Sequence, residues 1–271
     1  MVYLKFYLKF QNLKKNMLNI SIIIPCYNEE YRLPSTLKKI ESWLKTQDLF
    51  KIELILSNDG SNDNTIEIMK SAKIKFENNN LCEVKVLDFV HKGYIATLFE
   101  SYKKSLNEIV CNMEADCSIH PRNFEIFSRY LGEYDMIQGS RILKSSEFKS
   151  DNKSLIRSFV SIFFSFLFRF IFGCKIYDPQ CGFKMIKKQK LITCLNNIKL
   201  QHDGMKISEL TLKFYKRKYP IKEIPVENFH DDDSRLVPKF SLLNPFPFLK
   251  VILLNLKALV SLYKLYKQEN F

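Results

Sequence analysis

The residues best suited to chemistry are two carboxylates one residue apart, Glu114 and Asp116, in the segment NMEADCSIHP. They follow the apolar run Ile109–Cys111, which predicts a short buried strand. Where the backbone turns at the end of a strand, two such carboxylates can converge on one hard divalent cation, Mg²⁺ or Mn²⁺. A cation there is well placed to hold a diphosphate. The plain alternative is a solvated acidic loop.

The elements that must position this pair alternate between short strands and helices through the first half of the chain. This order is typical of a mainly parallel sheet with right-handed crossovers, in which ligands bind beyond the carboxyl ends of the strands. The sequence therefore predicts an α/β fold with four loops at one sheet edge: Cys26–Glu30, Asn58–Thr65, His91–Gly93 and Glu114–His120. We expect strands at 19–25, 52–57, 84–87, 109–113, 136–138 and 221–226, and helices at 33–44, 64–72, 93–106 and 205–216.

Composition limits the class of protein. Of the 271 residues, 46% are hydrophobic, with 23 Phe and 13 Tyr, so a large core is available. The formal net charge of +13 favours anionic partners, and it is concentrated in 141–190, where 11 Lys and Arg face three acidic residues. No nucleic-acid-binding motif accompanies the charge, so we expect no nucleic acid partner. The seven cysteines form no CxxC pair and predict reduced thiols in a cytosolic compartment.

Two apolar segments approach the length of a membrane span without reaching it. The first, Phe159–Phe172, contains Arg169, and we expect a membrane-facing helix at 154–173. The second, Phe248–Tyr266, carries Lys250, Lys257 and Lys264 at seven-residue spacing, which favours a helix lying in the membrane interface. The alternative for both segments is a core helix. We expect the chain to sit on the cytoplasmic face of a membrane, peripheral or monotopic.

The domain organisation is simple. Residues 1–16 form a basic extension with a tandem YLKF, and Met17 is an alternative translation start. We expect one catalytic domain at 17–240 and an amphipathic C-terminal helix within 241–271.

Taken in order, the loop sequences resemble those of the family 2 glycosyltransferases, which have a GT-A fold. The resemblance runs from about Ile20 to Pro238. It departs from the family pattern twice, because Asn58 stands where an acidic residue is usual and Glu114 replaces the first Asp of an Asp-x-Asp metal motif. The motifs that carry it are IIIPCYNEE (22–30), SNDGSNDNT (57–65), HKG (91–93) and MEADCSIHP (113–121).

Within this family the chain is most similar to polyprenyl-phosphate sugar synthases of the dolichyl-phosphate glucosyltransferase type. The resemblance implies inverting transfer of a hexose from a nucleoside diphosphate sugar, with UDP-glucose favoured and GDP-mannose possible, to a polyprenyl (dolichyl or undecaprenyl) phosphate. The motifs behind it are GSR (139–141), Arg157, DPQCGFK (178–184), ELTLKFYKRKYPIKEIPV (209–226) and a following Ser-Arg.

The resemblance also implies roles for individual residues. Glu114 and Asp116 would hold a divalent cation, with Asp116 as the principal ligand. Arg141 and Arg157 would hold the acceptor phosphate together with Ser234 and Arg235, since a guanidinium suits bidentate phosphate binding; a surface ion pair is the alternative. Asp116, Arg141, Arg157 and Asp178 form the expected catalytic set. The expected nucleotide-sugar contacts are Pro25, Tyr27, Glu29, Asn58, Asp59, Lys92, Glu114, Asp116, Gln180 and Gly182.

Three alternatives stay open from the sequence. Tyr27, Glu29 and Asp59 lie in segments that also make good turns and helix caps, without any ligand. The acceptor could be a glycan or lipooligosaccharide rather than a lipid phosphate. The departures at Asn58 and Glu114 would also fit a member that binds nucleotide without catalysing transfer.

Overall fold

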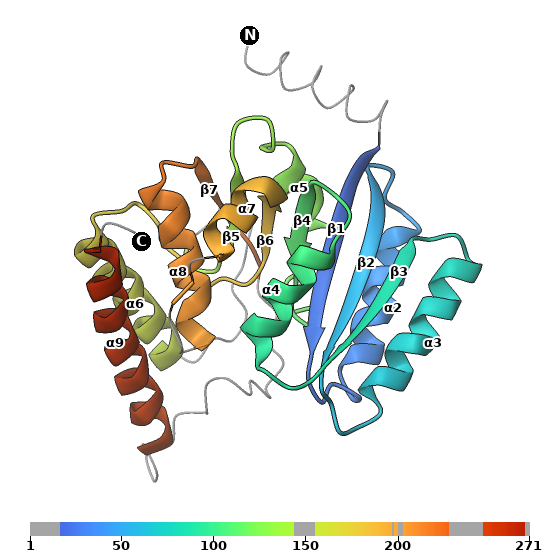
Figure 1. Cartoon of the computed structure of the whole chain (residues 1–271), viewed down its shortest axis with the longest axis horizontal. Coiled ribbons are helices and arrows are strands. Elements are labelled where there is room, and N and C mark those ends of the chain that lie inside the picture. Colours follow the sequence, from blue (N-terminus) through green and yellow to red (C-terminus); the bar gives the residue numbers. More distant parts are fainter. Residues whose placement is uncertain (1–16, 144–154, 197, 200–202, 228–245, 269–271) are drawn as a thin grey trace.

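A computed structural model describes residues 17–143, 155–196, 198–199, 203–227 and 246–268. Within these residues, seven strands form one sheet in the order β3-β2-β1-β4-β6-β5-β7 (Figure 1). All neighbouring pairs are parallel except those of β6, which runs antiparallel to both β4 and β5. The strands are β1 (Leu18–Cys26), β2 (Phe50–Asp59), β3 (Glu83–Phe89), β4 (Ile109–Asn112), β5 (Met136–Ser140), β6 (Lys184–Lys187) and β7 (Ile221–Pro225).

Helices cover both faces of the sheet. Three of them, α2, α3 and α5, bury side chains such as Leu37, Phe76 and Phe127 against one face. On the other face, α4, α7 and α8 contribute Leu98, Leu191 and other apolar side chains to a second core cluster. The helices are α2 (Leu33–Leu44), α3 (Thr65–Asn78), α4 (Tyr94–Lys104), α5 (Asn123–Ser128), α6 (Leu155–Phe172), α7 (Lys188–Leu195), α8 (Asp203–Lys216) and α9 (Phe246–Tyr266).

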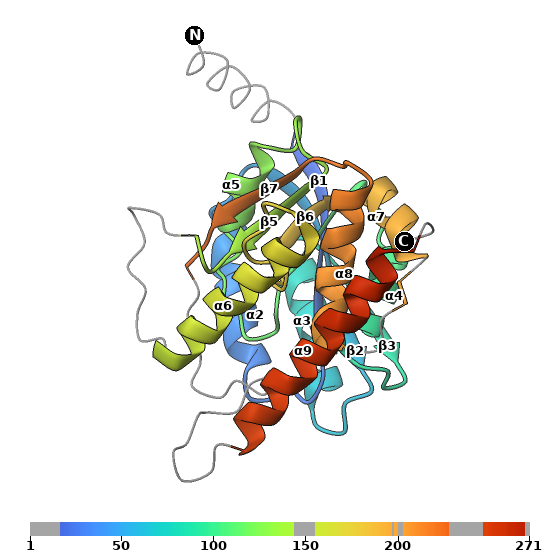
Figure 2. The ribbon, with the colours of Figure 1, turned by 90° about the vertical axis from the view of Figure 1, so that its left-hand side faces the viewer.

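The two remaining helices, α6 and α9, form an outer layer over α8. Figure 2 shows them side by side in front of the sheet. Phe168 and Phe172 of α6 pack with Leu259 and Leu262 of α9 and with Leu212 of α8 in a third apolar cluster. Consequently α8 is buried on two sides, by the sheet and by the outer layer.

Away from this cluster, α6 and α9 expose large apolar side chains. Phe163, Phe166 and Phe170 of α6 are 50%, 53% and 77% exposed, although a phenylalanine on a soluble surface is normally covered. On α9, the three lysines expected to form a polar stripe, Lys250, Lys257 and Lys264, are all exposed. Of the helices in the described residues, none combines the length and apolar character needed to cross a bilayer. Other exposed apolar side chains of this layer are Ile162, Leu253, Leu254, Val260 and Tyr263.

These observations confirm the predicted fold class: a mixed, mainly parallel sheet flanked by helices, with a helix near the C-terminus. The expected strands and helices are present, with ends shifted by a few residues. Three elements were not predicted, namely α5, β6 and α7. The expected boundary at 240/241 and the N-terminal extension 1–16 lie outside the described residues.

Candidate functional site

The loops after β1 and β2 are tied to each other at the carboxyl edge of the sheet. The backbone N–H of Asn28 donates to Ser61 Oγ at 2.9 Å, and that of Glu29 donates to Thr65 Oγ1 at 2.7 Å. In return, the N–H of Asn62 donates to Asn28 Oδ1 at 2.9 Å. Asn28 has a φ of +52°, a left-handed conformation that Asn tolerates better than most residues. The two loops therefore form one unit.

Asp59, at the end of β2, organises the third loop. Its buried carboxylate accepts hydrogen bonds from the backbone N–H groups of Lys92 at 2.9 Å and Gly93 at 3.0 Å, and from Thr97 Oγ1 at 2.6 Å. A carboxylate at this place stabilises the N-terminus of α4. Asn58 donates from Nδ2 to Asp88 Oδ1 at 2.7 Å and accepts the N–H of Ser61. Contacts of this kind stabilise turns and helix N-termini without any ligand. Nucleotide binding by Asn58 and Asp59 therefore stays a prediction.

The other residues expected to contact the nucleotide include Pro25 and, in the first loop, Tyr27 and Glu29. Pro25 lies in β1 opposite Ser57 of β2. The rings of Tyr27 and His91 are stacked with their centroids 4.2 Å apart, which forms an aromatic surface. Glu29 is buried and accepts a hydrogen bond from Arg32 Nε at 2.7 Å.

The acidic pair follows β4 in a tight turn. The N–H of Cys117 donates to the carbonyl of Glu114 at 3.1 Å, and Cys117 has a φ of +51°. Ser118 contacts both carboxylates: its N–H donates to Asp116 Oδ1 at 2.9 Å and its Oγ donates to Glu114 Oε2 at 3.1 Å. The turn therefore brings Glu114 and Asp116 together around Ser118; that they share a divalent cation stays a prediction.

Gly182 forms the wall opposite Glu114. A Cβ at this position would lie 2.9 Å from Glu114 Oε1 and 3.3 Å from the hydroxyl of Tyr94. The first distance is shorter than a side-chain carbon atom tolerates, so a larger residue at this position would displace the Glu114 carboxylate. The DPQCGFK segment and the acidic turn, far apart in sequence, thus meet directly.

The electrostatics of the acidic turn fit a cation. Burial and the nearby Asp116 carboxylate raise the pKa of Glu114, against the opposing effects of Arg141 and the Ser118 hydroxyl. Two carboxylates that disfavour each other's charge are relieved by a bound divalent ion. In the described residues no cluster of three or more His, Cys, Asp or Glu could enclose a metal. Mg²⁺ is commonly held by only one or two carboxylates plus substrate phosphates, and a pair of carboxylates is compatible with that mode of binding.

Arg141 and Asp178 form a bidentate ion pair beside the acidic turn. Arg141 donates from Nε to Asp178 Oδ2 at 2.8 Å and from one terminal nitrogen to Oδ1 at 2.9 Å, and its backbone N–H also donates to Oδ2. Burial alone would raise the pKa of Asp178, but Arg141 reverses this and lowers it. Since a guanidinium has five N–H donors, pairing with Asp178 is compatible with binding a phosphate as well.

A set of buried polar side chains that hydrogen-bonds to the Asp178 backbone was not predicted from the sequence. Lys184 donates to Gln138 Oε1, and Gln138 Nε2 donates to Glu223 Oε1 at 3.0 Å. Glu223 in turn accepts the N–H groups of Tyr177 at 2.7 Å and Asp178 at 2.8 Å. The signal in the sequence is that Lys184 and Glu223 are charged residues inside apolar runs, FKMI and IKEIPV.

Other expected site residues lie elsewhere or outside the described part of the chain. Gln180 Nε2 contacts Met205 Sδ at 3.3 Å, on the side of α8. Arg157 belongs to α6, but its side chain lies outside the described residues, as do Ser234 and Arg235. Their assignment to the acceptor phosphate stays a prediction.

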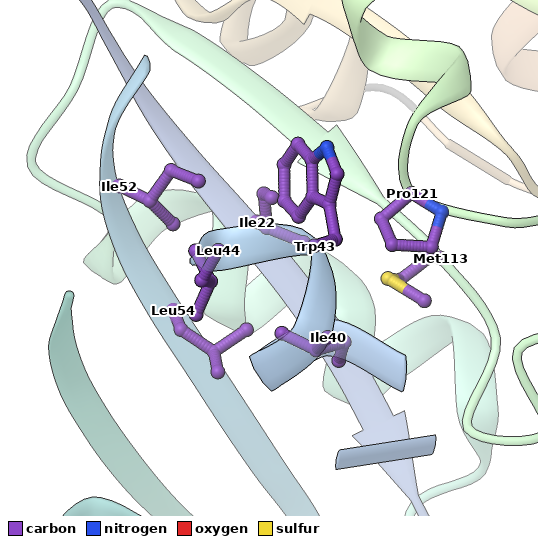
Figure 3. A pocket seen from close by; sticks show the side chains of 8 residues that line it. All are labelled: Ile22, Ile40, Trp43, Leu44, Ile52, Leu54, Met113 and Pro121. Carbon is purple, nitrogen blue, oxygen red and sulfur yellow. The ribbon is translucent and has the colours of Figure 1, made fainter. Parts of the chain in front are cut away.

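An apolar pocket lies on the other side of the sheet, under α2 (Figure 3). Its lining comes from α2, β1, β2 and the segment after β4, and it includes no charged side chain. The indole N–H of Trp43, one of the lining residues, donates to Glu125 Oε1 at 2.7 Å. This pocket is a gap in the core packing and takes no part in the site. It is lined by Ile22, Ile40, Trp43, Leu44, Ile52, Leu54, Met113 and Pro121.

A parallel-sheet edge that combines an acidic turn, a backbone-rich loop unit and a buried Arg–Asp pair suits a nucleotide-dependent transferase. Residues 21–195 match the family model described as Glycosyl transferase family 2. The match covers more than half of the chain, so the chain belongs to this family and is a glycosyltransferase.

Particular relatives add detail. A dolichyl-phosphate beta-glucosyltransferase of Trichomonas vaginalis is 26% identical over 214 residues, which are 72% of this chain and 65% of that protein. The dolichyl-phosphate beta-glucosyltransferase of Homo sapiens is 25% identical over 237 residues, 83% of this chain and 71% of the human protein. The chain thus spans just under two thirds of the Trichomonas relative's length.

A solved structure supports the fold. Glucosyl-3-phosphoglycerate synthase from Mycobacterium tuberculosis, in complex with Mn²⁺, UDP-glucose and phosphoglyceric acid, matches with a TM-score of 0.59 at 16% identity. The match covers 93% of this chain and 82% of the synthase. It agrees with the GT-A fold expected from the sequence motifs.

Proposed function

We propose that the chain transfers a hexose, glucose in the first instance, from a nucleoside diphosphate sugar to a polyprenyl phosphate at a membrane surface. The observation that carries this proposal is the meeting of the acidic turn and the Asp178–Arg141 pair across Gly182. One side of the site suits a cation and the other suits an anion. A donor diphosphate and an acceptor phosphate need this combination.

On the donor side, Glu114 and Asp116 would hold a divalent cation. When bound, Mg²⁺ or Mn²⁺ supplies positive charge that stabilises the departing nucleoside diphosphate. Ser118 holds both carboxylates in place through its N–H and hydroxyl. The stacked Tyr27 and His91 rings offer a surface for the nucleotide base. The Mn²⁺ and UDP-glucose in the solved synthase support this assignment.

On the acceptor side, Arg141 would orient a lipid phosphate. A phosphate monoester has its second pKa near 6, so it is largely dianionic at pH 7 and needs no strong general base. An oxygen of the acceptor phosphate forms a bond to the anomeric carbon while the bond from that carbon to the donor diphosphate breaks, with inversion. Positioning and charge stabilisation then provide most of the catalysis.

The outer layer of α6 and α9 supports a membrane location. Its exposed phenylalanines could enter the acyl region while Lys250, Lys257 and Lys264 meet anionic headgroups. The N-terminal ends of both helices lie toward the carboxyl edge of the sheet (Figures 1 and 2). A polyprenyl chain could therefore remain in the bilayer while its phosphate approaches Arg141. Seven free thiols agree with the cytoplasmic face.

The test is transfer of label from UDP-glucose or GDP-mannose to a short polyprenyl phosphate, with Mn²⁺, Mg²⁺ or EDTA. We expect metal-dependent entry of label from UDP-glucose into the organic phase. Transfer from GDP-mannose alone would correct the donor. Metal-dependent nucleotide binding without any lipid product would contradict the proposal and favour a glycan acceptor or a member without transferase activity.

A further inference from the structure

Three polar side chains lie side by side across three neighbouring strands of the sheet, β6, β5 and β7. Gln138 of β5 is in register with Lys184 of β6 on one side and with Glu223 of β7 on the other. Lys184 and Gln138 are completely buried. Charged side chains are rarely buried to this extent unless they have partners, and we call these three residues the polar row.

The hydrogen bonds within the polar row lead from Lys184 to Gln138 and from Gln138 to Glu223, toward the site. Lys184 Nζ donates to Gln138 Oε1 and to Thr211 Oγ1 of α8, the latter at 3.2 Å. Gln138 uses its other end to donate to Glu223 Oε1 at 3.0 Å and to the carbonyl of Asp178 at 3.3 Å. Each member therefore fixes the rotamer of the next.

The row ends on the backbone that carries Asp178. Glu223 accepts the N–H groups of Tyr177 and Asp178 with its two carboxylate oxygens. The Asp178 side chain is then held in place to accept two hydrogen bonds from the guanidinium group of Arg141. Lys184 thus acts on Arg141 through two side chains and one backbone segment, and it does not itself reach the site.

We propose that Lys184 is a positioning residue: through Gln138 and Glu223 it fixes the 177–178 backbone and thereby the orientation of Arg141 toward the acceptor phosphate. The part concerning the acceptor depends on the function proposed above. The part concerning the 177–178 backbone depends only on the contacts of the row.

The charge environment gives this role a pH signature. Burial lowers the pKa of Lys184 to about 8, although Cys181, Asp178 and Glu223 oppose the shift. The charge of Arg141 lowers the pKa of Lys184 further, whereas Thr211 of α8, which accepts a hydrogen bond from Lys184, is neutral. Above this pH the row loses the positive charge that holds Gln138 and Glu223. The Cys181 thiol, whose pKa burial raises to about 12, stays protonated in the same range.

The first experiment measures amide hydrogen exchange in Lys184→Met. We expect exchange in the 174–181 segment to become about tenfold faster or more, because the acceptor of the Tyr177 and Asp178 amides is no longer fixed. The helices α2 and α3 on the opposite face should be unchanged. Lys187→Met, on the same strand but paired with Asp135 outside the row, is the matched control. Unchanged exchange at 174–181 in a folded Lys184→Met protein would overturn the proposal.

The second experiment compares transfer kinetics in the same two variants. We expect Lys184→Met to raise the KM for a short polyprenyl phosphate and lower kcat about tenfold, with the KM for UDP-glucose unchanged. Lys187→Met should behave as wild type. Equal losses for donor and acceptor would indicate general damage and overturn the positioning role.

The third experiment follows pH. The rate of transfer by the wild type should fall as pH rises through about 8. The rate of Lys184→Arg should not fall over this range, because the charge of Arg does not titrate there. Over the same range the stability of the wild type relative to Lys184→Met should rise, because the unfolded state binds more protons between about pH 8 and 10.5. The same fall in the transfer rate above this pH in Lys184→Arg would contradict the proposal. If the wild type transfers to no lipid phosphate, the proposed function fails, and hydrogen exchange alone decides whether the row fixes the 177–178 backbone.

Discussion

The two regions of this glycosyltransferase that we propose as the nucleotide side and the acceptor side are built in different ways. On the nucleotide side, the loops after β1, β2 and β3 are held by hydrogen bonds between side chains and nearby backbone groups, as in the contacts of Asn28 and Asp59. On the acceptor side, Arg141 depends on an ion pair and a buried row that joins three strands. The first arrangement depends on local turn chemistry, and the second on long-range burial of charge.

This difference explains what could be predicted. The parallel strands and their loops follow from apolar runs ending in polar turns, so the sheet edge and the convergence of Glu114 and Asp116 were foreseeable. β6 was missed because Lys184–Lys187 is short and begins and ends with lysine, which is unfavourable in a strand judged alone. Lys184 can be buried in β6 because Gln138 and Thr211 accept hydrogen bonds from its ammonium group. No sequence pattern identifies those partners. Likewise, the pairing of Arg141 with Asp178 required the β5–β6 register.

The largest expected effect tests the nucleotide side. Asp116→Ala should lower kcat by about 10²–10³-fold, or about 3–4 kcal/mol in the barrier, because the donor diphosphate loses its principal charge stabilisation. Stability should change little, since Asp116 is only partly buried and the hydrogen bond that it accepts from the Ser118 N–H lies within its own turn. The measurement is label transfer under saturating Mn²⁺, and Glu67→Ala, exposed on α3, is the control. Residual activity within threefold of wild type would remove Asp116 from the site.

On the acceptor side, both activity and stability should suffer. Arg141→Met leaves Asp178 buried without its counter-charge, so we expect a loss of about 3 kcal/mol in the free energy of unfolding. Denaturant unfolding at pH 7 measures it. Adding Asp178→Asn should recover part of the stability without recovering transfer. If Arg141→Met alone proves as stable as wild type, the acceptor side does not depend on this pair.

The junction of the two sides can be tested at Gly182. Gly182→Ala places a methyl group 2.9 Å from Glu114 Oε1, and we expect about a tenfold loss in kcat/KM, or roughly 1.4 kcal/mol. Glu114→Asp shortens the opposing carboxylate and should lessen that loss in the double variant. A double-mutant cycle with strictly additive effects would show that the two residues do not meet during turnover.

A smaller effect is expected at the outer layer. Phe166→Ser should weaken binding to vesicles containing anionic lipid about tenfold, because burial of one phenylalanine in an apolar medium contributes about 1.5–3 kcal/mol. Ile74→Ser, at an apolar residue on α3 that is slightly more exposed than Phe166, should leave vesicle binding unchanged. Equal effects of both substitutions in a sedimentation assay would argue against α6 as the membrane-facing element.

The smallest expected effect is a difference between two proteins in how steeply the free energy of unfolding falls with decreasing pH. Because the pKa of Asp178 is lowered in the folded protein, its contribution to stability is present above the ordinary carboxyl range and is lost as pH falls through the folded pKa. Below about pH 4, wild type should therefore lose stability more steeply than Asp178→Asn. Parallel curves from unfolding at pH 3–6 would show that the ion pair contributes nothing to acid stability.

The position of α8 between the sheet and the outer layer has a practical consequence for handling this protein. Deleting α9 to obtain a more soluble enzyme would uncover Leu212 and Met205 on the helix that also carries Thr211. The truncated chain would exchange one apolar surface for another and loosen the support of Lys184. Replacing the outward-facing phenylalanines of α6 one at a time, with α9 kept, is the sounder route to a form that can be purified without detergent.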